Sequence, residues 1–298
     1  MSLEKGGPVI NDSFLNSNSK NSILFRQNRI KGFIQNILNS RKRRDEEHVQ
    51  DLKDAIVKEF SGLGSQKYFF RSANSGLWNS EKFFIEKYFC QPGKLLDIGC
   101  GTGRTSLPLS ERGFQVTGID FSTEMINAAR RIAIEKCINI TYMDGDAARL
   151  DFPENSLDYV FFSNQGWAQN PSKELRMDIL REVRRVLRDK GIFIFTTHER
   201  KFYSSRMLFW IYMWIKLFII KPTGFEVREI DYGDLFFKRI VDSEMGLLAS
   251  EQFMHIPTIK EVKDMIKKSG LTVLEINNNH ISETDSRDTP PVFYVCKK

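Results

Sequence analysis

The chain has 298 residues, which is enough for one large domain or for a domain with a substantial appendage. Hydrophobic residues make up 41% of it and aromatic residues 12%, which excludes an intrinsically disordered chain. The net charge of +6 suggests RNA or an anionic membrane as a partner, but three acids directly follow the densest basic block, residues 41–44. Adjacent opposite charges are typical of a solvated helix face, with RNA-backbone or membrane-surface contact as the alternatives.

The cysteines and the first residues indicate where the protein works. The four cysteines form no C-x-x-C pair and no framework of short spacings, so we expect reduced thiols in a cytoplasmic protein. Residues 1–22 are polar and lack the apolar stretch of a secretory signal. Histidines and acids do not recur at ligand spacing, so no metal site is expected.

The first part of the chain is expected to be an extension of the main domain. Residues 1–22 are expected to be disordered. Apolar residues then recur at three- and four-residue steps over residues 22–60, which predicts one or two amphipathic helices. Residues 66–90 are rich in aromatic side chains and predict a further helical region. We therefore expect an extension over residues 1–65 and a main domain over residues 66–298.

From residue 94 onward, apolar runs alternate with amphipathic stretches, which predicts an α/β fold with a doubly wound sheet. Ser122 is the expected N-cap of one helix, and Gly113 and Gly191 are the expected terminators of two others. A last helix is expected to begin at Thr258 and to end at Gly270, before two closing strands. The expected strands are 94–98, 115–119, 138–142, 157–162, 191–197, 271–276 and 292–296, and the expected helices are 103–112, 122–136, 172–188 and 257–269.

A glycine-rich stretch after the first expected strand indicates a ligand site. Asp97 lies near the end of that strand, and alternate glycines follow from Gly99 to Gly103. This pattern predicts a tight turn and then a helix whose N-terminus faces the ligand. The next strand ends in Asp120, 21 residues beyond Gly99. Related folds present a carboxylate to a ribose diol at an offset of about 20 residues.

The charges near this turn discriminate between two ligands. A dinucleotide site has the pattern G-x-G-x-x-G, whereas this chain has G-x-G-x-G, with Arg104 where a further glycine near the phosphates is expected. The carboxylate of Asp97 would repel a pyrophosphate but would suit an ammonium group. S-adenosylmethionine carries an amino-acid head, a ribose and an adenine but no phosphate, so the charges favour it over NAD.

The stretch from Leu95 to Arg130 resembles the nucleotide-binding half of class I S-adenosylmethionine-dependent methyltransferases, and the likeness continues through residues 143–147 and 157–197. The resemblance implies a Rossmann-like sheet of seven strands with the last strand antiparallel, and S-adenosylmethionine as cofactor. It implies methyl transfer by in-line displacement to nitrogen or oxygen, or alternatively to carbon, of a small metabolite, and the aromatic residues of the inserted segment favour an apolar or aromatic one. A tRNA wobble-uridine methyltransferase is the alternative, and a non-catalytic protein that binds S-adenosylmethionine or S-adenosylhomocysteine is a second one.

The resemblance also assigns residues to the methionine and ribose parts of the cofactor. Asp97 would hold the ammonium group, and Asp120 would accept both ribose hydroxyls. Asn164 would lie near the transferring methyl group, and Tyr68 and Arg71 belong to a segment that would close over the methionine end. The turn residues that would lie against the ligand are Gly99, Cys100, Gly101 and Gly103.

The adenine contacts are assigned in the same way. Asp146 would take the exocyclic amine, with Asp144 as the competing candidate, and the backbone amide of Ala147 would meet a ring nitrogen. Phe121 and Met125 would flank the adenine or would be ordinary core residues.

Residues 199–255 interrupt the fold between its fifth strand and its last helix and are expected to form a lid. Within them, residues 207–220 are almost continuously apolar but fall short of the about 20 residues of a transmembrane helix, so no span is expected. The favoured interpretation is a helix packed over the catalytic cleft with Trp210 and Trp214 shielded, and a helix resting on a bilayer is the alternative. Residues 225–240 suggest strands of the same lid.

Histidines and tryptophans are the candidates for acting on the acceptor. A general base is needed only when the nucleophile arrives protonated. His198 follows the fifth strand at the carboxyl edge of the sheet and is the candidate base or substrate contact, and His255 is a further substrate contact in the same cleft. A structural role is the alternative for both. Trp167, Trp210 and Trp214 would bind an apolar acceptor or would merely pack the lid onto the sheet.

Overall fold

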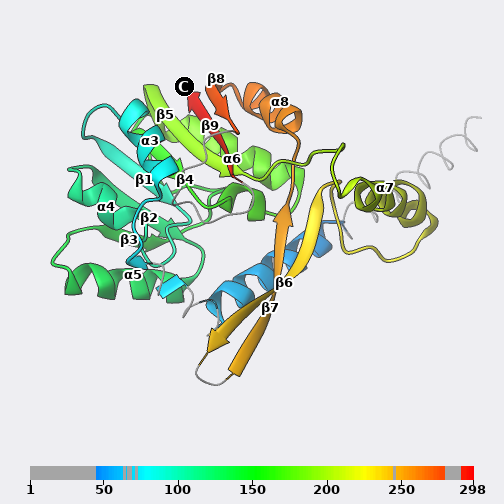
Figure 1. Ribbon diagram of the computed structural model, residues 1–298. Helices are drawn as coiled ribbons and strands as arrows, with labels where there is room; N and C mark the ends of the chain where they lie inside the picture. The colour runs from blue at the N-terminus through cyan, green and yellow to red at the C-terminus, as the bar shows by residue number, and fades with distance from the viewer. Residues whose placement is uncertain (1–44, 63–64, 66–68, 71–72, 244–245, 279–289) are drawn as a thin grey trace, which may run out of the picture. The chain divides into compact units, whose positions relative to one another are not determined.

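The computed structural model describes residues 45–62, 65, 69–70, 73–243, 246–278 and 290–298 (Figure 1). The chain divides into two compact units, residues 1–50 and 51–298. Residues 45–50 of the first unit are helical, and so are residues 51–61 of the second, which confirms helical structure in the extension. The expected disorder of residues 1–22 lies outside the described residues, and the expected domain boundary at residue 65 stays a prediction.

Seven strands form one sheet in the order β3-β2-β1-β4-β5-β9-β8 (Figure 1). The first five in this order pair in parallel, and β9 is antiparallel to both of its neighbours. The predicted doubly wound, Rossmann-like sheet with an antiparallel last strand is therefore confirmed. The strands are β1 (Lys94–Ile98), β2 (Gln115–Asp120), β3 (Thr141–Asp144), β4 (Leu157–Phe162), β5 (Leu187–Thr197), β8 (Thr272–Asn277) and β9 (Val292–Lys297).

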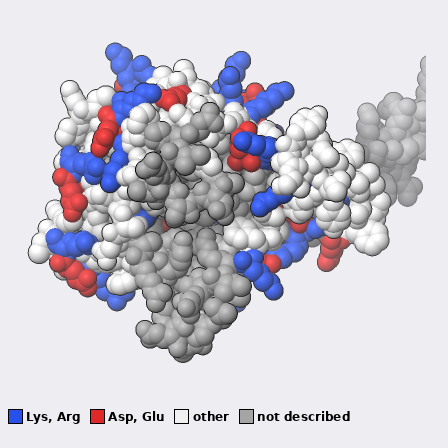
Figure 2. All heavy atoms as spheres, viewed as in Figure 1, with Lys and Arg blue, Asp and Glu red and all other residues white. Residues whose placement is uncertain are grey.

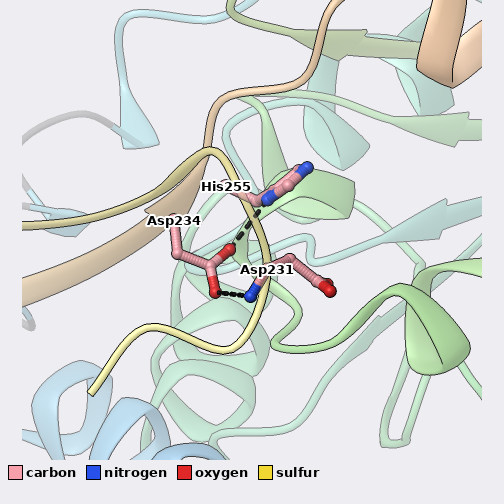
Figure 3. Close-up of side chains that lie close together, drawn as sticks. All are labelled: Asp231, Asp234 and His255. Carbon is pink, nitrogen blue, oxygen red and sulfur yellow. Dashed lines mark hydrogen bonds and ion pairs between the residues drawn. The ribbon is translucent and has the colours of Figure 1, made fainter. Parts of the chain in front are cut away.

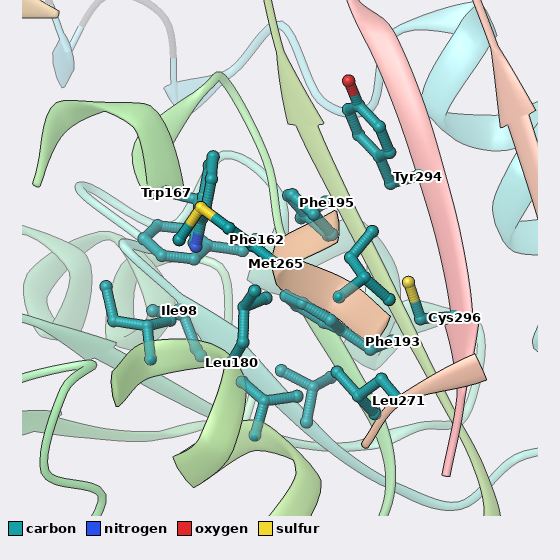
Figure 4. Close-up of a cluster of buried hydrophobic side chains, with 14 of the residues drawn as sticks. Ile98, Phe162, Trp167, Leu180, Phe193, Phe195, Met265, Leu271, Tyr294 and Cys296 are labelled. Carbon is teal, nitrogen blue, oxygen red and sulfur yellow. The ribbon is translucent and has the colours of Figure 1, made fainter. Parts of the chain in front are cut away.

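Alternating apolar side chains bury both faces of this sheet. On one face, Leu95 and Ile194 pack with Phe84 of helix α3 (Asn79–Tyr88). On the other face, Phe193 and Phe195 pack with residues of helices α6 (Lys173–Val186) and α8 (Ile259–Ser269), as Figure 4 shows. Both faces must be covered for so apolar a parallel sheet to be stable. At the carboxyl ends of the strands, Asp97 and Asp120 are buried polar side chains.

Helix caps follow the sequence expectations closely. The side chain of Ser122 accepts a hydrogen bond from the backbone of Met125 and begins α5 (Thr123–Glu135). Thr258 caps α8, and Gly270 ends it with a φ of 84°. Helix α4 (Ser106–Glu111) begins three residues later than expected, because residues 101–105 still belong to the turn.

The prediction that Gly191 ends a helix was wrong. Strand β5 already begins at Leu187, directly after α6, so Gly191 lies inside the strand. A Cβ atom at this position would come within 2.9 Å of the Arg188 carbonyl oxygen and of the Leu187 side chain. The glycine is therefore needed for a close backbone approach, at a place where the pairing of β4 and β5 shifts its register.

The inserted segment contains a helix and a hairpin (Figure 1). Helix α7 (Met207–Ile215) continues into a π-helix, η2 (Lys216–Ile220), and a 3-10 turn, η3 (Lys221–Thr223). Strands β6 (Asp234–Ser243) and β7 (Gly246–His255) form a separate antiparallel pair, so the predicted strands begin later than residue 225. Within the described part of the chain, no helix has the length and apolarity needed to cross a membrane.

Candidate active site

A tight turn after β1 leads the chain into α4 at the carboxyl edge of the sheet. Gly103 has a φ of 93°, and a Cβ atom there would lie 2.6 Å from the hydroxyl oxygen of Tyr142. Gly101 has a φ of 53° with open space where its Cβ would be. Only glycine adopts this conformation without strain, and at Gly101 the bare backbone leaves room for a ligand.

Beneath this turn lies the carboxylate of Asp97, one oxygen of which has no hydrogen-bond partner. Its side chain is fully buried, and its Oδ2 accepts hydrogen bonds from the hydroxyls of Thr105 at 2.6 Å and Ser106 at 2.5 Å. Its Oδ1 is also buried, but it has no hydrogen-bond partner. Burial raises the pKa of Asp97 to about 6, although both hydroxyls oppose the shift. A buried carboxylate oxygen without a partner is a natural place for a cationic ligand group.

Asp120 holds the opposite side of the turn. Its Oδ2 accepts a hydrogen bond from the backbone of Gly101 at 2.9 Å, and its Oδ1 accepts one from Ser122 at 3.0 Å. Burial raises the pKa of Asp120 to about 6, against the effect of these backbone donors. Each carboxylate oxygen accepts more than one hydrogen bond, so the side chain can still accept two ligand hydroxyls.

The edge expected to face the adenine includes residues from the extension. Phe121 is 40% exposed, whereas Met125 is buried. Phe60 lies edge-on to Phe121 with ring centroids 5.5 Å apart, and Lys53 pairs with Asp146 at 2.9 Å. Sequence reasoning missed both Phe60 and Lys53, because their helical periodicity carries no sign of a ligand.

Four further residues were expected to contact the cofactor, and the structure describes two of them. Ala147 is partly buried and packs against the core. Asn164 follows β4 with a φ of 51°, a left-handed conformation at the same sheet edge. Tyr68 and Arg71 lie outside the described residues.

A buried ion pair joins the glycine turn to α3 and β4. The guanidinium of Arg104 donates to both carboxylate oxygens of Glu81 at 2.7 and 2.8 Å, and to the hydroxyl of Ser163 at 2.8 Å. The same group stacks on Trp78, 3.9 Å from the ring centroid. Arg104 therefore fixes the shape of the site through protein contacts, a role that its position in the motif did not reveal.

His255, Asp234 and Asp231 meet beside the turn that precedes β6 (Figure 3). The Nδ1 of His255 lies 2.8 Å from Oδ1 of Asp234, whose Oδ2 accepts hydrogen bonds from the backbone of Ile230 and Asp231. Arg176 closes the group with a 2.7 Å ion pair to Asp231. Strand β7, which ends at His255, lies against the 3-10 helix η1 (Gly166–Gln169) that follows β4.

The protonation of this group follows from its surroundings. Burial, and then the positive charge of Arg176, lower the pKa of His255. Burial alone would raise the pKa of Asp234, but the hydrogen bond from His255, the backbone hydrogen bond from Asp231 and the charge of Arg176 outweigh it and lower that pKa. A neutral imidazole beside an ionised carboxylate donates from Nδ1 and keeps Nε2 as an acceptor.

Three ligand atoms of Asp231, Asp234 and His255 lie within 4.8 Å of one another, a spacing that a cation could use. No sequence pattern predicts this group, because its members are up to 24 residues apart. Arg176 already supplies a positive charge to Asp231, and His255 binds Asp234. Protein contacts therefore already engage all three side chains.

Comparison with known proteins settles the family. A family model described as a methyltransferase domain matches residues 95–191. An uncharacterized methyltransferase of Synechocystis is 30% identical over 173 residues, which are 55% of this chain and 76% of the relative. The chain belongs to the S-adenosylmethionine-dependent methyltransferases. The resemblance and the cofactor expected from the sequence are thereby confirmed.

Two further comparisons show how far the likeness extends. A demethylmenaquinone methyltransferase of Geobacillus is 25% identical over 239 residues, 78% of this chain and 92% of that protein. The crystal structure of an S-adenosylmethionine-dependent methyltransferase from Methanosarcina mazei has a TM-score of 0.58 at 22% identity, and covers 75% of this chain and 98% of that one. This structural likeness shows that the methyltransferase shares the fold over most of its length.

The aromatic residues expected to bind the acceptor have different surroundings in this methyltransferase. Trp167 is fully buried in the core (Figure 4). Its indole Nε1 donates to the carbonyl of Arg176 at 3.0 Å. Its side chain therefore stabilises η1 rather than lining a surface that an acceptor reaches. Trp210 is buried as expected, but Trp214 is 48% exposed, so the expectation that the lid shields both was wrong for Trp214.

His198, the expected base, is partly buried directly after β5. It lies at the carboxyl edge, as predicted. His255 combines a similar position with an orienting carboxylate, which makes it the better candidate for proton transfer in the methyltransferase.

Proposed function

We propose that this methyltransferase methylates a small apolar or aromatic molecule at a nitrogen or oxygen atom that arrives protonated. The observation that carries the proposal is the Asp234–His255 pair beside η1, at the sheet edge where ligands of such folds bind. A histidine oriented by a buried carboxylate is suited to removing a proton, and a nucleophile that is already unprotonated would not need one. Transfer to carbon is the alternative for the acceptor atom.

The cofactor contacts proposed from the sequence fit this chain. S-adenosylmethionine supplies an electrophilic methyl group on a sulfonium. The unpartnered Oδ1 of Asp97 suits the ammonium group, and the exposed ring of Phe121 suits the adenine. Asp120 suits the ribose, and the backbone of the turn can approach it closely. These residues hold the methyl group, and Asp234 orients His255 toward the proton of the nucleophile.

An RNA acceptor is the less favoured alternative. The surface cations are interspersed with acids (Figure 2), and pairs such as Arg188–Asp158 and Arg228–Glu251 balance part of the positive charge. RNA backbones select clusters of unpaired Lys and Arg. The Geobacillus relative is named for demethylmenaquinone, an apolar ring compound, which supports an apolar acceptor here as well. The four free cysteines support a cytoplasmic location.

Methyl-labelled S-adenosylmethionine tests the proposal. The full chain is incubated with it and a cell extract, and the label is followed by mass spectrometry in the RNA, aqueous-metabolite and organic-solvent fractions. Label in a small molecule of the organic fraction supports the proposal. Label in RNA alone would replace it with the tRNA alternative, and the absence of label despite measured cofactor binding would favour the non-catalytic alternative.

A further inference from the structure

Helices α7 and η2 present an apolar surface that the described residues leave uncovered. Leu208 is 76% exposed, and Phe218 and Ile219 are more than half exposed. An exposed apolar surface of this kind marks an interaction site. We call it the α7–η2 face, and its members are Leu208, Ile211, Tyr212, Ile215, Phe218 and Ile219.

The opposite side of the same segment is already anchored to the protein. Trp210, Met213 and Leu217 point inward and are buried. Lys216 pairs with Glu229 at 2.7 Å, and Lys221 donates to the Glu229 carbonyl. Because these contacts fix the segment, the α7–η2 face is not the inner side of a lid that has swung open.

The charges around this face indicate its partner. Residues 201–225 contain four basic residues and no acid. Figure 2 shows the lobe formed by this segment as an almost uniformly white surface, with charged side chains of both signs only at its edge. Tyr212 of this face is half exposed, and so is Trp214, whose ring lies 5.6 Å from that of Phe218; amphipathic aromatic rings favour the interface between lipid and water. A protein partner would give no reason for the complete exclusion of acids.

We propose that the α7–η2 face docks on the surface of an anionic lipid bilayer. Residues 207–220 form a helix of about 21 Å, too short for the about 30 Å hydrocarbon core, so it would lie in the interface rather than span it. Apolar side chains then enter the acyl region, while the exposed Lys201 and Arg206 meet anionic headgroups.

The docking segment is connected to the proposed base. The hydroxyl of Tyr232 donates to the Trp210 carbonyl at 3.1 Å, and Tyr232 lies between Asp231 and Asp234 in the chain. Arg200 stacks on Tyr232 at 4.2 Å and lies 5.7 Å from the ring of Trp210. Docking would therefore hold His255 close to the bilayer, so an acceptor dissolved in lipid could reach it. This consequence rests on the proposed function, whereas the docking does not.

Vesicle sedimentation tests the docking with the full chain. The probe is extruded vesicles of phosphatidylcholine with phosphatidylglycerol, at a salt concentration of about 0.15 M. We expect the wild-type protein to pellet with these vesicles and the double variant Leu208→Ser/Phe218→Ser to bind at least about tenfold more weakly, because two large side chains no longer enter the lipid. Ile134→Ser is the matched control, since Ile134 is 75% exposed on α5 and lies outside this face.

Fluorescence and sedimentation velocity distinguish a lipid bilayer from a second copy of the chain as the partner of the α7–η2 face. Vesicles should shift the emission of Trp214 to shorter wavelength, and Trp214→Phe should remove the shift. The proposal is overturned if wild type stays in the supernatant or if the double variant pellets like wild type. It is also overturned if the double variant turns a dimer into a monomer, since the face would then join two copies. The labelling experiment with methyl-labelled S-adenosylmethionine contains no vesicles, so it is independent of docking and tests the proposed function separately.

Discussion

The edge of the sheet and the inserted segment depart from normal burial in opposite directions. At the edge, Asp97 is a carboxylate buried without a countercharge on its Oδ1. In the insertion, Leu208 and Phe218 are apolar side chains that remain in water. Both arrangements are unfavourable in the isolated protein, since a buried charge needs a partner and an apolar surface needs cover. Each departure therefore marks a place where a different ligand completes the molecule.

The largest effect is expected at the ribose carboxylate. Asp120→Ala should weaken S-adenosylmethionine binding by about 10²–10⁴-fold, because each of two hydrogen bonds to a charged acceptor contributes about 1.5–3 kcal/mol. Calorimetric titration measures the loss. Asp120 also accepts two backbone hydrogen bonds, so thermal melting and the milder Asp120→Asn variant must accompany it. Asp178→Ala on the surface of α6 is the control, and an affinity of Asp120→Ala within twofold of wild type would remove Asp120 from the site.

The next effect is expected at the proposed base. His255→Gln should lower kcat for the acceptor found by labelling at least about 100-fold with little change in KM, because proton removal acts in the transition state. The pKa of His255 is lowered, so wild-type activity should be constant near neutral pH and should fall only below about pH 6.5.

Asp234→Asn separates orientation from chemistry at this base. It should lower kcat and shift the acidic limb of the pH profile, because the carboxylate holds His255 in the tautomer with a free Nε2. An unchanged profile in His255→Gln would assign proton removal elsewhere, with His198 as the next candidate.

A smaller effect is expected on the stability of the ligand-free protein, and replacing Asp97 should increase that stability. The folded-state pKa of Asp97 is raised to about 6, so its stabilising contribution is complete below the unfolded pKa and is lost as pH rises through about 6. Asp97→Asn should therefore raise the free energy of unfolding of the ligand-free protein by about 1–2 kcal/mol near pH 8, since an unpartnered amide costs less than an unpartnered charge. Denaturant titration should show no gain near pH 4, and S-adenosylmethionine binding should be weakened at both pH values.

The smallest effect is expected at the outer edge of the adenine region. Lys53 and Asp146 form a solvent-exposed pair, and such pairs contribute about 0–1 kcal/mol. Lys53→Met should change cofactor affinity by less than about fivefold. A loss as large as that of Asp120→Ala would show that the extension, rather than the sheet edge, dominates cofactor binding.

The two regions also differ in how much the sequence predicted. Asp97 and Asp120 were found because a local pattern, a strand followed by alternating glycines, fixes their positions. The Asp234–His255 pair depends on the β6–β7 hairpin and on Arg176 from a distant helix, contacts that no local period encodes. Trp214 was wrongly expected to be shielded, because an apolar run shows that burial is favourable but not what supplies it. The prediction for Gly191 was wrong for a similar reason, since in the sequence a glycine needed for close packing cannot be distinguished from one that ends a helix.

The number of protons released on cofactor binding tests most directly whether S-adenosylmethionine supplies the missing partner of the buried carboxylate at the sheet edge. Asp97 and Asp120 both have pKa values of about 6, so each is about half protonated at that pH and should ionise when the ligand arrives. The release is measured by calorimetric titration with S-adenosylmethionine in buffers of different ionisation enthalpy. The wild-type protein should release about one proton near pH 6 and almost none near pH 7.5. Asp97→Asn should release about half as much as wild type near pH 6. Tight binding near pH 6 without proton release, or an undiminished release in Asp97→Asn, would contradict the account.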